Sequence, residues 1–251
     1  MAEQIWLEPG RRVLDLGCGW GALLDSIRRA GATGVGVTLS SAQMESCHRH
    51  GLDVHLQDAR EVTRDTFGPF DAVASLGAFE HFCSPEDYAA GRQEDIYRGL
   101  FAHVAGLLPE RGRFYLQTMV FCRNMIGVEQ IDRHAPRDSD AWYLAMMVAA
   151  FPGSWLPFGS EQVERCAEPH FPPRVEPERP RRLPRDDPPV GQAHREVDPR
   201  LALLKLRLIP TWLTSPDFRF AFTSGGDSSN LVCFERELMD HFRFTFEKVD
   251  A

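Results

Sequence analysis

Three glycines at alternate positions lie near the start of the chain, in the run Asp15-Leu16-Gly17-Cys18-Gly19-Trp20-Gly21. Glycine allows positive φ angles and lets a ligand approach the backbone closely, because it has no Cβ. Arg12 to Leu16 reads as a buried strand, and about Ala22 to Arg29 reads as a helix. A turn between a strand and a helix, at the carboxyl edge of a parallel sheet, is where such folds bind nucleotides. We therefore expect a cofactor loop here, and the alternative is a structural glycine turn that binds nothing.

The spacing of the glycines separates two kinds of cofactor. A dinucleotide site has the pattern G-x-G-x-x-G, with an acidic residue closing the second strand to hold the ribose. This chain has G-x-G-x-G, and Thr38 occupies the place of that acid. The spacing resembles the first motif of class I methyltransferases, which implies S-adenosylmethionine as the cofactor. Nicotinamide or flavin binding is the alternative.

Two further segments make the resemblance more specific. Gly19-Trp20-Gly21, followed by Gly36-Val37-Thr38-Leu39-Ser40-Ser41-Ala42-Gln43, resembles the cyclopropane-fatty-acid and mycolic-acid cyclopropane synthases, which are S-adenosylmethionine-dependent methyltransferases. In that family the Thr and Gln of this stretch contact the cofactor, which implies the same role for Thr38 and Gln43. Ser40 or Ser41 is also suited to cap the following helix.

A third contact to the cofactor is expected after the third strand. In this fold the segment that matches Asp58-Ala59 contacts the adenine, so the resemblance implies that role for both residues. A plain turn aspartate is the alternative for Asp58.

The run Ser75-Leu76-Gly77-Ala78-Phe79-Glu80-His81-Phe82 resembles the S-I-G-A-F-E-H-F stretch of the same family. The family's reaction adds the sulfonium methyl to an alkene and then removes a proton from the added methyl, with a bound bicarbonate ion held partly by the Glu that matches Glu80. The resemblance thus implies a catalytic Glu80 and bicarbonate as a second bound group. A carboxylate favoured by the dipole of a helix start is the alternative for Glu80, and His81 reads as structural.

Aromatic rings near Glu80 could stabilise a carbocation through their negative faces. The candidates are Phe79, Trp142, Tyr143 and Trp155. Taken singly, each of these side chains is better explained as part of the core.

The chain departs from the family at other bicarbonate ligands. Where the family has His in an L-H-T-I strand, this chain has Leu116-Gln117-Thr118-Met119. Gln117 is the candidate in that place, and its amide can donate a hydrogen bond but cannot carry a proton as His does. A family Cys lies well before the glycine loop, where we expect this chain to begin too late to contain it. The segment that should hold a family Tyr contains no tyrosine.

The elements that position these residues alternate along the first 120 residues as short apolar strands and amphipathic helices. This alternation predicts an α/β fold with helices on both faces of a parallel sheet. The last strand, Phe242 to Lys248, alternates apolar and polar residues as an edge strand does. We expect a class I methyltransferase Rossmann-like doubly wound sheet, mostly parallel with an antiparallel C-terminal edge strand, plus a helical insertion.

We expect one methyltransferase domain over residues 1–251. Its parts are a cofactor-binding half (1–120), a helical insertion that covers the substrate (121–171), an irregular Pro/Arg-rich tract (172–200), and a C-terminal helix and edge strand (201–251). Nine of the chain's 18 prolines lie between Pro169 and Pro199, a density that neither helices nor central strands tolerate. Two hypotheses explain the tract. One is a double frameshift, in which the correct reading frame is lost near Phe171 and regained near Leu201, and the other is a genuine insertion.

The composition restricts the partners. A net charge of -8 argues against nucleic acid, since phosphate binding needs a basic face. The six cysteines include no C-x-x-C pair, so we expect neither zinc nor any other metal site, no disulfides, and a reducing cytoplasm. The dense apolar segment Leu201 to Ile209 is a candidate for peripheral contact with the inner membrane face, with a buried core helix as the alternative.

These features predict methyl transfer to the double bond of an unsaturated fatty acyl chain, giving a cyclopropane or a methyl branch. The alternatives are a C-methyltransferase acting on another lipid, a terpenoid or a polyketide, and a truncated or frameshifted relative with little activity.

Overall fold

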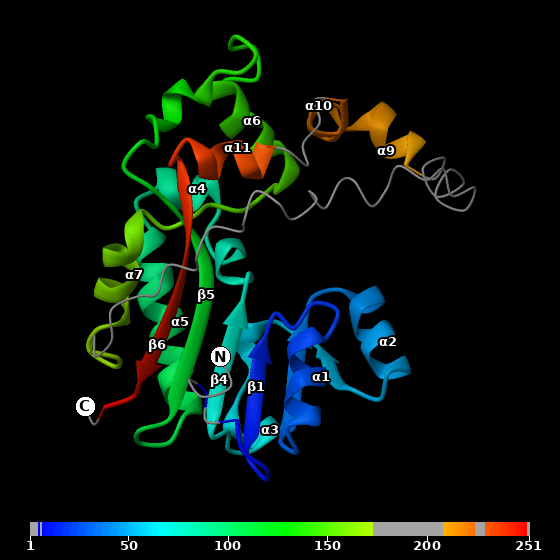
Figure 1. Ribbon diagram of the computed structural model, residues 1–251, viewed down its shortest axis with the longest axis vertical. Coiled ribbons are helices and arrows are strands. Elements are labelled where there is room, and N and C mark those ends of the chain that lie inside the picture. The colour runs from blue at the N-terminus through cyan, green and yellow to red at the C-terminus, as the bar shows by residue number, and fades with distance from the viewer. Residues whose placement is uncertain (1–4, 6, 173–207, 224–228, 250–251) are drawn as a thin grey trace. The chain divides into compact units, whose positions relative to one another are not determined.

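The computed structural model describes residues 5, 7–172, 208–223 and 229–249 (Figure 1). The chain divides into two compact units, the first formed by the described parts of residues 1–120, 155–179 and 241–251, the second by those of 121–154 and 180–240. Most of the Pro/Arg-rich tract and residues 201–207 of the proposed membrane segment lie outside the described residues.

A sheet with the strand order β3-β2-β1-β4-β5-β6 forms the centre of the first unit. Its strands are β1 (Arg12–Leu16), β2 (Thr33–Thr38), β3 (Asp53–Leu56), β4 (Ala72–Leu76), β5 (Arg113–Phe121) and β6 (Met239–Glu247). The pairs β1–β2, β1–β4, β2–β3 and β4–β5 are parallel. The Lys248 N–H donates to Gly112 O and the Cys122 N–H donates to Leu238 O, both at 2.9 Å. These bonds connect the start of β5 with the end of β6 and the end of β5 with the start of β6, so the two strands are antiparallel. The sheet therefore confirms the predicted parallel core with an antiparallel C-terminal edge strand.

The burial of the strands follows their place in the sheet. Val13 and Leu14 of β1 are completely buried, as expected for a central parallel strand covered on both faces. In β6 the buried Phe242, Phe244 and Phe246 alternate with partly exposed residues, which suits an edge strand with one covered face.

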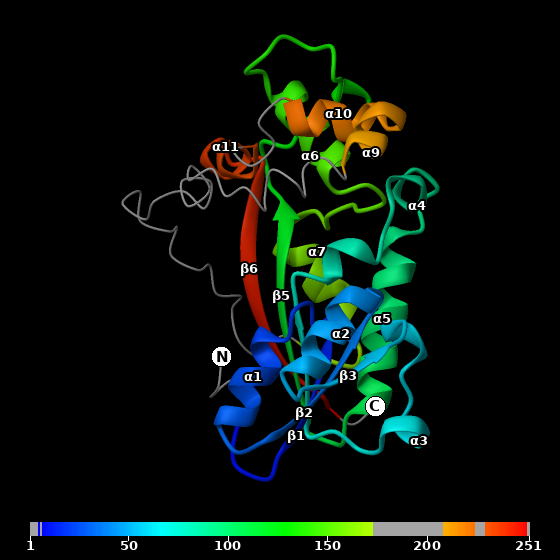
Figure 2. The same cartoon turned by 90° about the vertical axis from the view of Figure 1, so that its right-hand side faces the viewer.

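Helices cover both faces of the sheet in the first unit. These are α1 (Ala22–Arg29), α2 (Ser41–Arg49), η1 (Ala59–Glu61), α3 (Arg64–Phe67), η2 (Phe79–His81), α4 (Pro85–Ala89), α5 (Gln93–Leu107) and α7 (Gly159–Ala167). Helix α1 lies on one face and α5 on the other (Figure 2). Crossover connections in parallel sheets are right-handed, so reversing the direction of strand addition after β3 moves the later helices to the opposite face.

The second unit is helical, with η3 (Val128–Gln130), α6 (Asp140–Ala150), α9 (Ile209–Thr214), α10 (Pro216–Thr223) and α11 (Ser229–Glu235). The rings of Trp142 and Phe220 meet edge to face at 6.2 Å between α6 and α10. Arg236, just after α11, forms an ion pair with Asp140 of α6 at 2.8 Å. Within the described ranges, no helix combines the length and apolar character that a membrane span requires.

Candidate functional site

The site forms where the strand order reverses, at the carboxyl ends of β1 and β4. In open α/β sheets ligands bind at this switch point, because the loops of the two strands diverge there. The loop after β1 meets the loop after β4 at Gly17, where an added Cβ would lie 2.4 Å from the Cβ of Ala78. The fold therefore brings the glycine loop and the Glu80 segment to the same edge of the sheet.

The glycine loop is anchored to the neighbouring strand. The N–H groups of Gly17 and Cys18 both donate to Val37 O at 3.0 Å. Gly19 has φ +54°, a left-handed conformation that disfavours other residues, and no atom lies within 4 Å of where its Cβ would be. At Gly21 a Cβ would lie 2.5 Å from a Leu52 methyl. Gly17 and Gly21 thus allow close packing, whereas Gly19 leaves open space on the surface of the loop.

Asp15 is the second-last residue of β1 and comes just before the glycine loop in the chain. Its side chain is 2% exposed, and burial raises its carboxyl pKa to about 7. No hydrogen bond from another described residue reaches the carboxylate. Burial, and after it the charge of Asp15, raises the thiol pKa values of Cys18 and Cys47. A cationic group bound nearby would favour the charged form of Asp15.

Thr38 and Gln43 are in direct contact. The Thr38 hydroxyl donates to Gln43 Oε1 at 2.6 Å and accepts from the Ser40 N–H at 3.2 Å. Ser40 also caps α2, since its hydroxyl accepts from the Gln43 N–H at 3.3 Å. Because Oε1 accepts from Thr38, the Nε2 group of Gln43 is the end of the amide that can donate to a ligand.

The carboxylate of Asp58 is held within its own turn. It accepts from the Arg60 N–H at 2.9 Å and pairs with the Arg60 guanidinium at 2.5 Å. These hydrogen bonds hold the pKa of Asp58 below its ordinary value. The carbonyl of Ala59 contacts a ring nitrogen of His103 at 3.1 Å. The structure thus places Asp58 and Ala59 after β3 with these two oxygen groups already engaged.

Glu80 lies in η2 and is 3% exposed. Its Oε1 accepts from the Met119 N–H at 2.8 Å, while Oε2 is buried with no hydrogen-bond partner among the described residues. Burial raises the pKa of the carboxyl, and hydrogen bonding from the Met119 N–H, from the backbone of Glu80 itself and from the Thr118 side chain opposes that rise. The group therefore holds its proton more readily than an exposed glutamate.

Gln117 lies on β5 opposite Leu76 of β4. Its carbonyl accepts from the Gly77 N–H at 2.9 Å, which ties β5 to the loop that leads to Glu80. Residues two apart on a strand share a face, so the side chains of Gln117 and Met119 lie on the same face of the sheet. The structure records no hydrogen bond between Gln117 and Glu80.

The aromatic candidates divide between the two units. Phe79 is fully buried and stacks on Tyr97 at 4.4 Å, and Trp155 stacks on Tyr88 at 5.3 Å. In the second unit, Trp142 meets Tyr143 edge to face at 5.2 Å. The packing of Phe79 and Trp155 is that of core side chains.

Two exposed apolar residues at the site belong to the motifs described above but have no role in them so far. Trp20 is 67% exposed within the glycine loop, and Leu39 is 77% exposed directly after β2. Large apolar side chains at the ends of neighbouring strands suit an adenosine-sized ring. Their position inside the two cofactor motifs was the available signal. Among the described residues, no group of three or more His, Cys, Asp or Glu side chains could hold a metal ion.

Comparison with known proteins gives a consistent result. The family model described as "Mycolic acid cyclopropane synthetase" matches residues 1–175. Cyclopropane-fatty-acyl-phospholipid synthase of Escherichia coli K12 is 35% identical over 176 residues, which is 68% of this chain and 38% of that protein. Cyclopropane mycolic acid synthase 2 of Mycobacterium leprae is 30% identical over 165 residues, 62% of this chain and 52% of that protein. The chain thus spans less than two thirds of the length of these curated relatives.

Solved structures show the same architecture. The cyclopropane synthase MmaA2 from Mycobacterium tuberculosis aligns with a TM-score of 0.62 and 23% identity over 98% of this chain and 81% of that chain. The mycolic acid cyclopropane synthase CmaA1 complexed with SAH and CTAB aligns with a TM-score of 0.64 and 24% identity, with the same coverage. At this identity the likeness concerns the fold, and it confirms the predicted class I methyltransferase architecture.

Proposed function

This chain belongs to the mycolic acid cyclopropane synthetase family, and from that premise we propose that it is an S-adenosylmethionine-dependent methyltransferase. Its substrate would be the double bond of an unsaturated fatty acyl chain, and its product a cyclopropane or methyl-branched chain. The observation that supports this most is the contact of the glycine loop with the Glu80 segment at Gly17 and Ala78, because a methyl donor and a proton acceptor are needed at one place.

The residues at the switch point fit the cofactor. The open surface at Gly19 admits a ligand against the loop, and the N-terminus of α1 after Gly21 favours a carboxylate. Asp15 would balance the ammonium group, with Gly17 and Cys18 shaping the loop beneath it. Gln43 Nε2, oriented by Thr38, would donate to a ribose oxygen.

Asp58 and Ala59 would contact the adenine edge. The Asp58 carboxylate is engaged by Arg60 and the Ala59 carbonyl by His103, so we assign this contact to the Ala59 N–H. Trp20 and Leu39 would cover the apolar surface of the nucleoside.

When bound, S-adenosylmethionine supplies an electrophilic methyl group on a sulfonium. In the proposed reaction the alkene π electrons would form a bond to that methyl carbon as the carbon–sulfur bond breaks, which would leave positive charge on the acyl chain. Ring closure would then release one proton from the added methyl. Glu80 lies at this edge of the sheet, and its Oε2 is the atom to which we assign the control of that proton.

Bicarbonate also fits the Glu80 site. An orphaned buried oxygen with a raised pKa becomes a hydrogen-bond donor when protonated, which is what an oxyanion needs from a carboxyl group. Glu80 Oε2 would share a proton with bicarbonate, which the Gln117 amide would also hold, and the ion would take up the proton released at ring closure. The replacement of His by Gln117 leaves a donor there but no second proton carrier.

An acyl-lipid substrate favours contact with a membrane surface. We place this contact at the apolar and cationic segment from Leu201 to Ile209. Co-sedimentation with anionic liposomes at low salt tests it, and a protein that stays in the supernatant would exclude it.

Isothermal titration with S-adenosylmethionine tests the function at its first requirement. We expect one binding site per chain, with binding that is reduced when S-adenosylhomocysteine occupies the site beforehand. A chain that is folded by circular dichroism and releases no heat with either compound would contradict the proposal.

A further inference from the structure

The segment from Trp155 to Phe158 comes directly after residues 121–154 of the second unit and begins the second stretch of the first unit. Trp155 and Leu156 are buried, so their backbone N–H and C=O groups need partners other than water. The backbone carbonyls of Trp155 and Leu156 accept hydrogen bonds from side chains on α5. The Phe158 N–H donates to a side chain on α7.

Three buried polar side chains form this network: Gln93, Tyr97 and Gln162. The Tyr97 hydroxyl donates to Trp155 O at 3.1 Å. Gln93 Nε2 donates to Leu156 O at 2.9 Å and to the Tyr97 hydroxyl at 3.2 Å.

Gln162 completes the network from α7. Its Nε2 donates to Gln93 Oε1 at 3.2 Å, and its Oε1 accepts from the Phe158 N–H at 2.7 Å. Both ends of each amide are used, so the side chains hold one arrangement and fix the segment in place.

This segment also holds the turn that contains Glu80. The Trp155 N–H donates to the backbone carbonyls of Glu80, at 3.2 Å, and of Cys83, at 2.8 Å. The same residue's carbonyl accepts from Tyr97. The ring of Tyr97 also stacks on Phe79, which directly precedes Glu80, at 4.4 Å and 27°. Tyr97 therefore contacts the turn through its ring and, by way of Trp155, through its hydroxyl.

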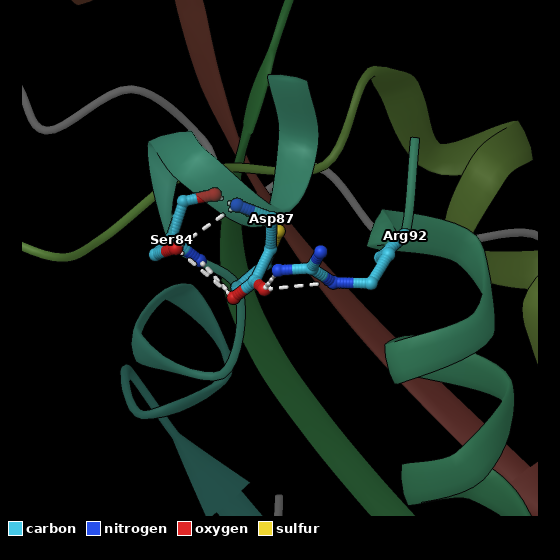
Figure 3. Close-up of polar contacts among 4 residues, drawn as sticks. Ser84, Asp87 and Arg92 are labelled. Atoms are coloured by element: carbon cyan, nitrogen blue, oxygen red, sulfur yellow. Dashed lines mark hydrogen bonds and ion pairs between the residues drawn. The ribbon is translucent and has the colours of Figure 1, made fainter. Parts of the chain in front are cut away.

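A second set of hydrogen bonds lies on the C-terminal side of η2 (Figure 3). Ser84 and Asp87 form a capping box at the start of α4: the Asp87 N–H donates to the Ser84 hydroxyl at 3.1 Å, and the Ser84 N–H to Asp87 Oδ2 at 3.2 Å. Arg92 donates to Asp87 Oδ1 at 2.5 Å, and the next residue is Gln93. The chain on both sides of η2 is thus connected to the start of α5.

We propose that Tyr97 is a positioning residue for Glu80, and that its hydroxyl, with Gln93 and Gln162, fixes the Trp155 peptide so that the Glu80 carboxylate stays on the Met119 N–H with Oε2 buried. This rests on the proposed function in giving Glu80 its chemical role. The contacts of Tyr97 do not reach the glycine loop, so its role concerns the proton chemistry and not the binding of the cofactor.

The test is Tyr97→Phe, which keeps the stacked ring and removes the hydroxyl. The matched control is Tyr88→Phe: Tyr88 stacks on Trp155 at 5.3 Å, and its hydroxyl makes no hydrogen bond to a described residue. Since a misplacement of about 1 Å can cost roughly 100-fold in rate, we expect kcat to fall at least about 10-fold in Tyr97→Phe. Affinity for S-adenosylmethionine should stay within about two-fold, since the loop that binds it is untouched.

A second measurement separates positioning from a general loss of stability and does not require activity. Carboxyl-labelled glutamate, assigned through Glu80→Gln, reports the titration of Glu80 by NMR. Loosening the turn admits water, so the Glu80 pKa should fall toward its ordinary value in Tyr97→Phe and stay unchanged in Tyr88→Phe. If the wild-type chain forms no product but the Glu80 titration shifts in Tyr97→Phe, the positioning role is supported and the proposed function is refuted. An active wild-type chain, with kcat and titration unchanged in Tyr97→Phe, refutes the positioning role alone.

Discussion

The Oε1 atom of Glu80 accepts a hydrogen bond from the backbone N–H of Met119 at 2.8 Å, across 39 residues of sequence. This bond joins the turn after β4 to the strand β5 and leaves Oε2 as the oxygen without a partner among the described residues. The carboxylate is therefore held through Oε1, while Oε2 lies buried.

Replacing Glu80 by Gln should remove product formation while changing the affinity for S-adenosylmethionine by no more than a few-fold. An amide cannot take up or release the proton, yet it can still accept from Met119. Product analysis and titration calorimetry measure the two effects. Glu86→Gln, on the exposed side of α4, is the control. Turnover by Glu80→Gln at the wild-type rate would rule out its catalytic role.

Replacing Gly19 by Asp should abolish cofactor binding, weakening it by about 100-fold or more. The new side chain would fill the open space at the loop, and its charge would face the cofactor's carboxylate. Gly91→Asp is a matched control, because Gly91 also has a positive φ, +70°, and open space around its Cβ position. Calorimetry that gives Gly19→Asp an unchanged dissociation constant would show that the loop is not the cofactor site.

Replacing Thr38 by Val should weaken cofactor binding by roughly five-fold, since one hydrogen bond contributes about 1 kcal/mol. Valine keeps the shape but cannot hold Gln43 Oε1. Thr33→Val, at the exposed start of β2, serves as the control. An affinity equal to that of the control would mean that Gln43 needs no orientation by Thr38.

Much of the fold could be predicted from local patterns. The expected strand from Arg12 to Leu16 and the helix from Ala22 to Arg29 have the bounds of β1 and α1, because apolar residues and glycines mark both ends. The predicted strand from Phe242 is confirmed as β6, although it begins earlier, at Met239. Helix α5 begins at Gln93, inside the polar network.

The contacts that position Glu80 could not be read from the sequence. Tyr97 and Trp155 lie 58 residues apart, and Gln93 and Gln162 lie 69 apart. No periodicity connects such residues, since their pairing depends on how helices pack on the sheet. The individual cofactor and catalytic assignments stay predictions, and the experiments above test them.

The stability of the fold should depend on pH through Asp15. Its folded pKa of about 7 lies above the unfolded value of about 3.9, so the folded state binds more protons between these values. Stability contributed by this group is therefore present below about pH 4 and is lost as pH rises to about 7.

Asp15→Asn removes the destabilisation that the ionised, buried carboxylate causes at higher pH. Its gain in unfolding free energy over the wild type should be about 2–3 kcal/mol larger at pH 8 than at pH 5, at one pKa unit per 1.36 kcal/mol. Urea denaturation at both pH values measures it, with Asp65→Asn on the exposed surface as the control. Equal gains at pH 5 and pH 8 would contradict the assignment of a raised pKa to Asp15.

The reaction that we propose is methyl transfer from S-adenosylmethionine to an acyl double bond. It is tested most directly by incubating the chain with S-adenosylmethionine that carries an isotopically labelled methyl group and with vesicles of a monounsaturated phospholipid. Mass spectrometry and NMR of the released fatty acids then show where the label lies. We predict acyl chains heavier by one labelled methylene or methyl group at the former double bond, and none with Glu80→Gln. Unlabelled, unaltered acyl chains from a sample that binds S-adenosylmethionine would rule out this reaction.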